Sequence, residues 1–234
     1  MKKQFYDALV VAHGDLPSEA CLKALSKASR RLIALDGAAD RLIAIGLWPH
    51  VILGDLDSIS ASALKSAPRH GTRIVQIKEQ KTSDLEKGLR FCKQRDWRCI
   101  AVTGFLGNRL DHSLNAFGVL SKFHALEITL ITSQSIARVL HGHSAFKCAV
   151  RPGQQISLMP LPIARGVALT GVKWPLRSQT LRQTGLVSLS NKATHTMVTV
   201  RQASGCSLFI VQRPPRQIDI ESVVERRRGL ARGT

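Results

Sequence analysis

Acidic residues are absent from most of the second half of this sequence. No Asp or Glu occurs between Ile128 and Ile218, whereas residues 1–127 contain thirteen. With 34 basic and 16 acidic residues in all, the chain has a formal net charge of +18. Such a balance attracts polyanions, among them nucleic acids and nucleotides. Carboxylates that cluster in so basic a chain are therefore candidates for a specific task.

Long apolar runs, paired cysteines and aromatic side chains are also scarce. No apolar run approaches the roughly 20 residues that a membrane-spanning helix needs. The five cysteines show no C-x-x-C spacing, which excludes a zinc ribbon and disfavours a disulfide framework, so we expect reduced thiols.

Aromatics make up only 5%, too few for a nucleic-acid surface built on base stacking. The residues Met1–Asp7 lack a signal-peptide core, and we expect a cytoplasmic protein with no membrane attachment.

The first 132 residues alternate short apolar runs with amphipathic segments. We predict strands at Tyr6–Ala12, Arg31–Leu35, Val51–Leu53, Arg73–Ile77, Arg98–Thr103 and Glu127–Thr132. We predict helices at Ser18–Ala28, Ala38–Ile45, Ala61–Ser66, Asp84–Arg95 and Asp111–Phe123. This alternation is typical of a parallel sheet with helices on both faces. Ligands bind such sheets beyond the carboxyl ends of the strands.

The pattern changes after Thr132 to short β-rich runs broken by Gly and Pro. They are Ala145–Val150, Gln155–Met159, Val167–Leu169, Leu186–Leu189, Thr196–Val200 and Ser207–Val211. Such runs indicate an antiparallel sandwich or barrel. The predicted fold class is therefore α/β: a Rossmann-like parallel sheet over residues 1–135, then an all-β sandwich over residues 136–213. Residues 214–234 form a basic tail that we expect to be flexible.

Four polar clusters follow predicted strands of the first domain. They are Asp36–Arg41, Gly54–Ser58, Lys81–Leu89 and Thr103–His112. Each has a purely structural alternative, such as a helix cap or a tight glycine turn. Each also suits a phosphate or cation site, since helix N-termini and spaced glycines offer backbone N–H groups to phosphate oxygens.

The second cluster contains two carboxylates, Asp55 and Asp57, which project to one side if the chain there is extended. Two charges about 4 Å apart repel by roughly 1 kcal/mol in water and ~4 kcal/mol at an effective dielectric of 20. A bound cation removes that cost, and Mg²⁺ commonly uses one or two carboxylates plus substrate phosphates. The alternative is that Asp57 or Ser58 caps a helix.

The other clusters add phosphate-binding features. Ser83 or Asp84 begins a predicted helix, Arg109 can clamp phosphate with two nitrogens, and Asp111 opens the next helix. The glycines of the fourth cluster match neither a Walker A loop nor the G-x-G-x-x-G fingerprint.

Taken together and in order, the four clusters resemble those of thiamine pyrophosphokinases. That family's pattern is D-G-[GA]-A-[ND]-R, then G-D-x-D-S, then T-D-x-x-x-A-L, then G-x-x-G-x-R-x-D-H. In the second domain Thr170–Leu176 is similar to the family's G-[LV]-[KR]-[WY]-x-L, and Gly185–Asn191 is similar to its G-x-x-S-x-S-N. The resemblance spans about residues 8–211.

The resemblance implies an ATP-dependent diphosphotransferase that moves the pyrophosphate of ATP to the hydroxyl of thiamine and releases AMP. It implies Mg²⁺ held by Asp55, Asp57 and Asp84. The implied catalytic residues are these three and Asp111, with Asp57 as the candidate general base. The implied ATP site contains Asp36, Gly37, Ala38, Asp40, Arg41, Thr82, Ser83, Gly104, Gly107, Arg109 and His112. The implied thiamine site contains Trp174, Ser188, Ser190 and Asn191 and lies between the subunits of a homodimer.

The sequence departs from the family pattern at three positions. Lys81 replaces a frequent acid, so it either contacts phosphate or weakens a second metal site. Ser83 replaces the usual Thr, and Phe105 replaces a frequent glycine and narrows the nucleotide pocket. Rival readings are a pyrophosphokinase for a pterin-type alcohol, an inactive homologue and a nucleic-acid-binding protein. We do not expect nucleic-acid binding.

Overall fold

The computed structural model describes residues 5–212. The predicted basic tail, residues 214–234, lies outside the described residues. The chain divides into two compact units, Met1–Ser133 and Gln134–Thr234, called the first and second unit below. In the described part of the chain, no helix has both the length and the apolar character needed to cross a bilayer.

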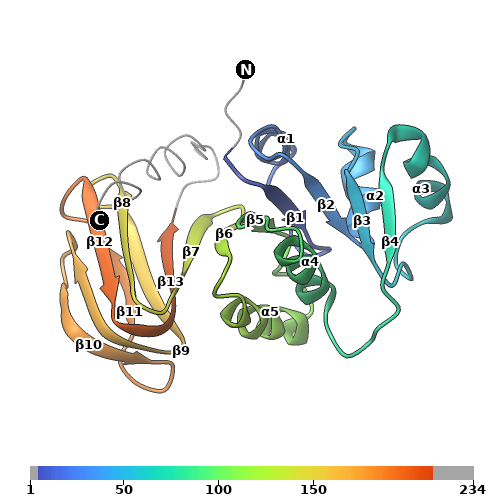
Figure 1. Ribbon diagram of the computed structural model, residues 1–234. Coiled ribbons are helices and arrows are strands. Elements are labelled where there is room, and N and C mark those ends of the chain that lie inside the picture. Colours follow the sequence, from blue (N-terminus) through green and yellow to red (C-terminus); the bar gives the residue numbers. More distant parts are fainter. Residues whose placement is uncertain (1–4, 213–234) are drawn as a thin grey trace. The chain divides into compact units, whose positions relative to one another are not determined.

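The first unit contains a parallel sheet with the strand order β4-β3-β2-β1-β5-β6 (Figure 1). Its strands are β1 (Ala8–Val11), β2 (Leu32–Leu35), β3 (Val51–Gly54), β4 (Arg73–Gln76), β5 (Cys99–Thr103) and β6 (Glu127–Ile131). Every residue of β1, β2, β3 and β5 is buried. Continuous apolar runs are expected for parallel strands that are covered on both faces.

Five α-helices and one short 3₁₀ helix connect these strands. They are α1 (Glu19–Lys27), α2 (Ala38–Ala44), α3 (Ala61–Ser66), η1 (Ala67–His70), α4 (Asp84–Lys93) and α5 (Leu110–Lys122). The Ser83 hydroxyl accepts a hydrogen bond from the backbone N–H of Glu86 and caps α4, as the Ser-x-x-Glu spacing predicts. Helix α4 packs on β1, β2 and β3. A Cβ atom at Gly88 would lie 2.8 Å from Leu35 Cδ2, so a side chain at this position would force Leu35 to shift.

The second unit is built from antiparallel strands around one long strand. The strands are β7 (Ser135–His141), β8 (Ser144–Ala149), β9 (Gln155–Thr170), β10 (Leu176–Arg182), β11 (Ser188–Lys192), β12 (Met197–Gln202) and β13 (Ser204–Gln212). Strand β9 pairs with β10, β11, β12 and β13, and the outer pairs are β7 with β13 and β8 with β12.

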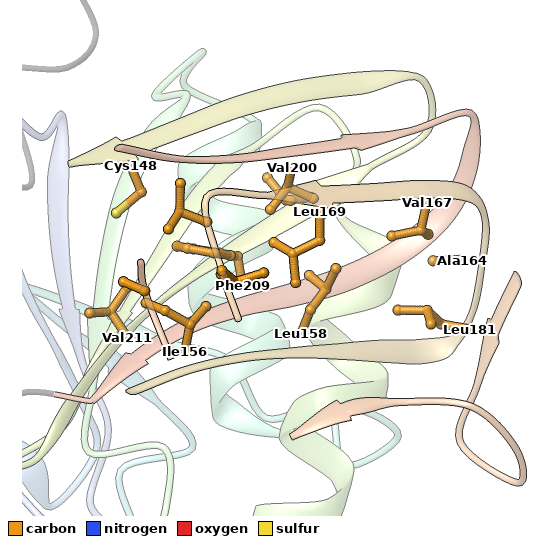
Figure 2. Packing of buried hydrophobic residues seen from close by; sticks show 14 residues of the cluster. Cys148, Ile156, Leu158, Ala164, Val167, Leu169, Leu181, Val200, Phe209 and Val211 are labelled. Carbon is orange, nitrogen blue, oxygen red and sulfur yellow. The ribbon is translucent and has the colours of Figure 1, made fainter. Parts of the chain in front are cut away.

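One apolar core joins the two halves of β9. Leu158 from its first half and Leu169 from its second half are both fully buried in the same cluster. Figure 2 shows Phe209 of β13 among these side chains, and its ring meets that of Phe146 edge to face at 5.5 Å. The strand must therefore bend so that both halves cover one core.

The predicted elements of the first unit are all present, with boundaries that shift by at most two residues. In the second unit, the two runs predicted at Gln155–Met159 and Val167–Leu169 form the single strand β9, and strands β7 and β10 were not predicted. Strand β10 escaped prediction because most of its residues are exposed and polar. The prediction of reduced cysteines is confirmed, since none of the five forms a disulfide and all are buried.

Replacing Phe209 by alanine should destabilise the protein by about 3–5 kcal/mol, because the change leaves a cavity in a packed core. Urea denaturation followed by circular dichroism measures this loss. The control is Leu114→Ala, at a side chain that is 64% exposed, which should change the free energy of unfolding by less than about 0.5 kcal/mol. Equal stability of the two variants would contradict the assignment of the core.

Candidate active site

A cavity of about 520 Å³ lies where the first unit's parallel strands end. Its walls include segments that follow β1, β2, β3 and β5, together with the beginnings of α4 and α5. Of the predicted nucleotide-site residues, it is lined by Asp36, Arg41, Ser83, Gly104, Gly107, Arg109 and His112. Of the predicted catalytic acids, Asp84 lines it. The carboxyl edge of the sheet thus carries a concave surface.

Three carboxylates meet at this edge. Each of Asp36, Asp55 and Asp84 offers an oxygen atom, and the three atoms lie within 4.8 Å of one another. They come from the ends of β2 and β3 and the first turn of α4. Each pair of charges at this distance repels by roughly 1 kcal/mol in water and about 3.5 kcal/mol at an effective dielectric of 20. This arrangement, called the acid cluster below, is a set of hard oxygen donors suited to a divalent cation.

The structure groups Asp36, rather than the predicted Asp57, with the other two acids. The sequence prediction assumed an extended chain across Asp55 and Asp57. Leu56, between them, has φ of +68°, so the chain turns at this residue and is not extended as the prediction assumed. Asp57 is exposed and accepts a hydrogen bond of 2.9 Å from the hydroxyl of Ser58.

Asp36 is the most buried member of the cluster, with 5% of its surface exposed. Burial raises the pKa of its carboxyl group, and the nearby charges of Asp84 and Asp57 act in the same direction, against the hydrogen bond from Ser58. That bond is donated by the backbone N–H of Ser58 at 3.4 Å. Asp36 also has φ of +47°, a conformation that costs a non-glycine residue about 1 kcal/mol or more. A buried, strained carboxylate beside two others is unfavourable without a ligand.

Asp55 and Asp84 receive compensating contacts. The side-chain amide of Gln80 donates a hydrogen bond of 3.0 Å to Asp55. This bond is the main reason that the pKa of Asp55 is lowered, with a further contribution from the charge of Lys87. The ammonium group of Lys87 lies 3.0 Å from Asp84 Oδ1. Each of these two acids therefore has a neighbouring donor within hydrogen-bond distance.

Two glycine-containing loops form the floor of the cavity. The backbone N–H of Gly14, after β1, donates a hydrogen bond of 2.7 Å to the carbonyl of Gly104, after β5. A Cβ atom at Gly14 would lie 1.9 Å from the carbonyl oxygen of Leu106. The loops thus approach so closely that position 14 admits no side chain.

Sequence reasoning missed the β1 loop altogether. Lining residues that were not predicted include His13, Gly14, Asp15, Ser58, Asn108, Ser113 and Asn115. The imidazole of His13 lies over Gly37, where a Cβ atom would be 2.6 Å from the ring. The rule that ligands bind beyond the carboxyl ends of parallel strands applies equally to β1, so the end of the first predicted strand was a usable signal.

The arginine side chains of the cavity wall are exposed, and each contacts a different partner. Arg41 donates a hydrogen bond of 2.5 Å to the carbonyl of Gly14. Arg109 forms an ion pair of 2.6 Å with Asp111, which raises the pKa of the guanidinium and lowers that of the carboxyl. His112 lies beside them. Asp111 itself does not line the cavity, so the structure gives it contact with Arg109 and not with the acid cluster.

The remaining predicted nucleotide-site residues do not line the cavity. Gly37 lies under the ring of His13, and Ala38 is fully buried in α2. Asp40 accepts a hydrogen bond of 2.8 Å from the backbone N–H of Ser60, at the start of α3. The Thr82 hydroxyl donates one of 2.6 Å to Glu79. Their observed contacts are structural.

Phe105 does line the cavity, as predicted, and its ring meets that of Phe117 edge to face at 6.3 Å. The Phe105 side chain is mostly buried. Lys81 is exposed.

In the second unit, Trp174 is 53% exposed at a loop before β10. The ammonium of Lys173 lies 4.8 Å from the centre of its indole ring. Asn191, which is 2% exposed, holds this loop. Its Oδ1 accepts a hydrogen bond of 3.1 Å from the backbone N–H of Trp174, and its Nδ2 donates one of 2.7 Å to the carbonyl of the same residue. The indole is thus presented outward from a fixed backbone.

The other predicted thiamine-site residues lie on β11. Ser188 is buried and accepts a hydrogen bond of 3.3 Å from Asn191 Nδ2. Asn191 Oδ1 also accepts one of 2.9 Å from the backbone N–H of Lys192. Ser190 is exposed and accepts one of 2.9 Å from the side-chain amide of Gln155. The amide of Asn191 has all its donors and acceptors engaged, so the structure gives it a positioning role and leaves Trp174 and Ser190 at the surface.

Known proteins match both units. The sequence profile of the thiamin pyrophosphokinase catalytic domain matches residues 22–132, and that of the thiamin pyrophosphokinase vitamin B1 binding domain matches residues 145–212. Together they span about three quarters of the chain. The chain belongs to the thiamine pyrophosphokinase family. It is an enzyme of that class, an ATP-dependent diphosphotransferase, and the pterin-type and nucleic-acid-binding alternatives are not favoured.

Individual relatives agree with this family assignment. Thiamine pyrophosphokinase 2 of Arabidopsis thaliana is 28% identical over 223 residues, which cover 84% of this chain and 83% of the relative. Thiamine pyrophosphokinase 1 of the same plant is 29% identical over 168 residues, 67% of this chain and 62% of the relative. The crystal structure of thiamine pyrophosphokinase from Bacillus subtilis superimposes with a TM-score of 0.75 at 21% identity, over 88% of this chain and 98% of that one. The structural match shows that the mixed α/β fold is shared.

Replacing Asp36 by asparagine should stabilise the metal-free protein at neutral pH, by roughly 1 kcal/mol or more, because it removes one charge from the acid cluster. The raised pKa means that the folded state binds a proton more readily than the unfolded state. Wild-type stability therefore falls as pH rises through the window between the two pKa values, and the variant escapes this loss. Thermal unfolding in EDTA at several pH values measures the difference, which should shrink below the ordinary carboxyl pKa.

The matched control is Asp111→Asn, because the pKa of that exposed carboxyl is lowered by Arg109. This control should not gain stability at neutral pH. A pH-independent effect of Asp36→Asn would contradict the burial of a charged carboxylate in the cluster.

Proposed function

We propose that this chain transfers the pyrophosphate group of ATP to the hydroxyl group of thiamine, giving thiamine pyrophosphate and AMP, with Mg²⁺ held at the acid cluster. In this proposal the first unit is a Rossmann-like catalytic domain, and the second is a β-sandwich domain that binds thiamine. The observation that carries the proposal is the convergence of three carboxylates within 4.8 Å beside a cavity of about 520 Å³. We further propose that the enzyme is cytoplasmic.

The residues of the acid cluster fit a magnesium ion. Mg²⁺ prefers oxygen ligands and usually combines carboxylates with substrate phosphates. We propose Asp55, Asp84 and Asp36 as its ligands. Asp57, two residues after Asp55, is a further candidate ligand. When bound, Mg²⁺ neutralises charge on the transferred phosphates and helps to align them. The raised pKa of Asp36 supports the proposal, because a nearby cation would remove the cost of ionising that buried group.

The loops of the cavity floor supply the phosphate contacts. Positioning and charge neutralisation account for most of the catalysis in phosphoryl transfer. The loops after β1 and β5 can bring backbone N–H groups close to phosphate oxygens, since Gly14, Gly104 and Gly107 keep side chains away. We propose that Arg41 and Arg109 reach into the cavity and bind phosphate, Arg109 leaving Asp111 to do so. A guanidinium pairs with phosphate through two parallel hydrogen bonds.

The transfer itself is an in-line displacement at the β-phosphorus of ATP. The thiamine oxygen forms the new bond, and the bond from the β-phosphorus to the oxygen that bridges to the α-phosphorus breaks, so that AMP leaves. The hydroxyl proton must pass to a base. Asp57 remains our candidate, since its carboxylate is exposed near the cluster and is not one of the three converging acids.

For thiamine we propose Trp174 as the aromatic platform, with Ser190 beside it. Thiamine carries a cationic thiazolium ring and an aminopyrimidine, and indole is the strongest aromatic partner for a cation. The described residues of the second unit include no Asp or Glu, so a π-face is the available partner for the cation there. We propose that Asn191 and Ser188 act indirectly, by holding the Trp174 loop.

We propose a homodimer in which the thiamine site of one subunit serves the nucleotide site of the other. Four large apolar side chains of the second unit are exposed by 44–57%: Trp174, Leu186, Leu189 and Met197. Large apolar side chains that are exposed to water are candidates for a binding surface. Burial of these side chains against a partner would remove their contact with water.

The purified protein with Mg²⁺-ATP and thiamine should form thiamine pyrophosphate and AMP in equal amounts, measured by chromatography. Asp55→Asn should lower turnover by at least about 100-fold, because it removes a metal ligand. Asp96→Asn, at an exposed acid remote in sequence from the cluster, should retain activity. Formation of ADP instead of AMP would show single-phosphoryl transfer and overturn the proposed reaction.

Replacing Trp174 by alanine should raise KM for thiamine by about 5- to 30-fold, as expected for a lost cation–π contact of ~1–2 kcal/mol. KM for ATP should stay unchanged. Asn191→Leu should act in the same direction because it frees the Trp174 loop. The control is Trp48→Ala, whose ring stacks on His70 in the first unit. An unaltered KM for thiamine in Trp174→Ala would place the vitamin elsewhere.

A further inference from the structure

Lys87 is a buried lysine beside the acid cluster, and the proposed mechanism gives it no role. Only 3% of its side chain is exposed, whereas that of its partner Asp84 is 35% exposed. Its ammonium donates a hydrogen bond of 3.0 Å to Asp84 Oδ1. Its charge also lowers the pKa of Asp55, so its field reaches a second member of the cluster. Lysine is almost never this buried unless it is paired.

The fold leaves Lys87 little freedom to move away. It lies in α4, three residues after Asp84, so both side chains occupy one face of the helix. The adjacent Gly88 packs against Leu35 and Val10, where even a Cβ atom would be too close to Leu35. The hydroxyl of Ser83 fixes the start of the helix. The lysine is therefore a permanent part of the site.

The arginine side chains that line the cavity differ from Lys87 in exposure. Arg41 and Arg109 are both exposed, and they contact Gly14 and Asp111 respectively. Water and salt screen exposed charges, but they screen a buried ammonium far less. Lys87 is thus the cation whose charge acts on the cluster most directly.

We propose that Lys87 is a positioning residue that serves as the internal counter-cation of the acid cluster and keeps the affinity of the nucleotide-free enzyme for divalent cations low. The cation is then taken up together with the phosphates of ATP. This inference rests on the proposed magnesium site. Three carboxylates carry three negative charges, and Lys87 offsets one of them. A free divalent cation therefore meets a net charge of two instead of three, until the phosphates of ATP add negative charge.

Two effects lower the affinity for the free cation. A metal ion must compete with the ammonium for Asp84, and the ammonium repels it from within the same buried site. Bound ATP phosphates supply further oxygen ligands and negative charge, so they offset both effects. A neutral side chain of similar length, such as methionine, removes the competition and the repulsion at once.

The test is a titration of the nucleotide-free protein with Mn²⁺, in which free Mn²⁺ is measured by electron paramagnetic resonance. Lys87→Met should bind Mn²⁺ at least tenfold more tightly than the wild type. A non-hydrolysable ATP analogue should tighten Mn²⁺ binding strongly in the wild type and by a smaller factor in Lys87→Met. The matched control is Lys122→Met, because Lys122 also forms a lysine–carboxylate pair with α4, 2.8 Å from Glu86. This control should bind Mn²⁺ like the wild type.

Thermal unfolding establishes that each variant is folded. Should Lys87→Met not fold, the conservative variant Lys87→Gln replaces it, since its amide can still donate a hydrogen bond to Asp84 without carrying charge. Equal or weaker Mn²⁺ binding in the neutral variants overturns the role of Lys87 and leaves the metal site standing. Absence of saturable Mn²⁺ binding in wild type and variants, with and without the nucleotide analogue, overturns the metal site and this inference with it.

Discussion

The mutual repulsion of three carboxylates, held within 4.8 Å of one another, is the constraint around which the first unit is organised. Parallel strands point their carboxyl ends to one edge, so the residues that follow β2 and β3 must meet there. The capped start of α4 brings Asp84 to the same place. Gln80 and Lys87 reduce the cost of this convergence on one side, while Asp36 remains buried in a strained conformation. The three carboxylates therefore repel one another, and a bound cation would relieve this repulsion.

The space beside the cluster depends on close approach of the backbone. Gly14 and Gly104 let the loops after β1 and β5 hydrogen-bond to one another. That contact leaves an open floor that side chains do not fill. The arginine side chains of the cavity wall are exposed, and they pair with a backbone carbonyl group or with Asp111. The partly buried acid cluster and these exposed cations thus lie in different parts of the same edge of the sheet.

In the second unit the notable feature is an exposed aromatic ring, that of Trp174. Its core closes around Phe209 and the two halves of β9, which leaves Trp174 outside. The backbone of that tryptophan is held at both its N–H and its carbonyl by the buried amide of Asn191. The polar motif on β11 therefore matters less as a ligand surface than as an anchor. Exposing an indole ring to water is unfavourable, and a ligand or a partner that covers the ring removes this free-energy cost.

The sequence by itself determined the strands and helices of the first unit, the edge at which polar clusters gather, and the family. Apolar runs, helix caps and ordered motifs are local signals, so they can be recognised in the sequence alone. Only the tertiary structure decided that Asp36 joins Asp55 in place of Asp57, because a positive φ at Leu56 is invisible in a pattern that assumes an extended chain. It also decided that β9 is one bent strand and that Lys87 lies buried within the acid cluster. Side-chain direction and burial come from contacts between distant segments, and no spacing along the chain encodes them.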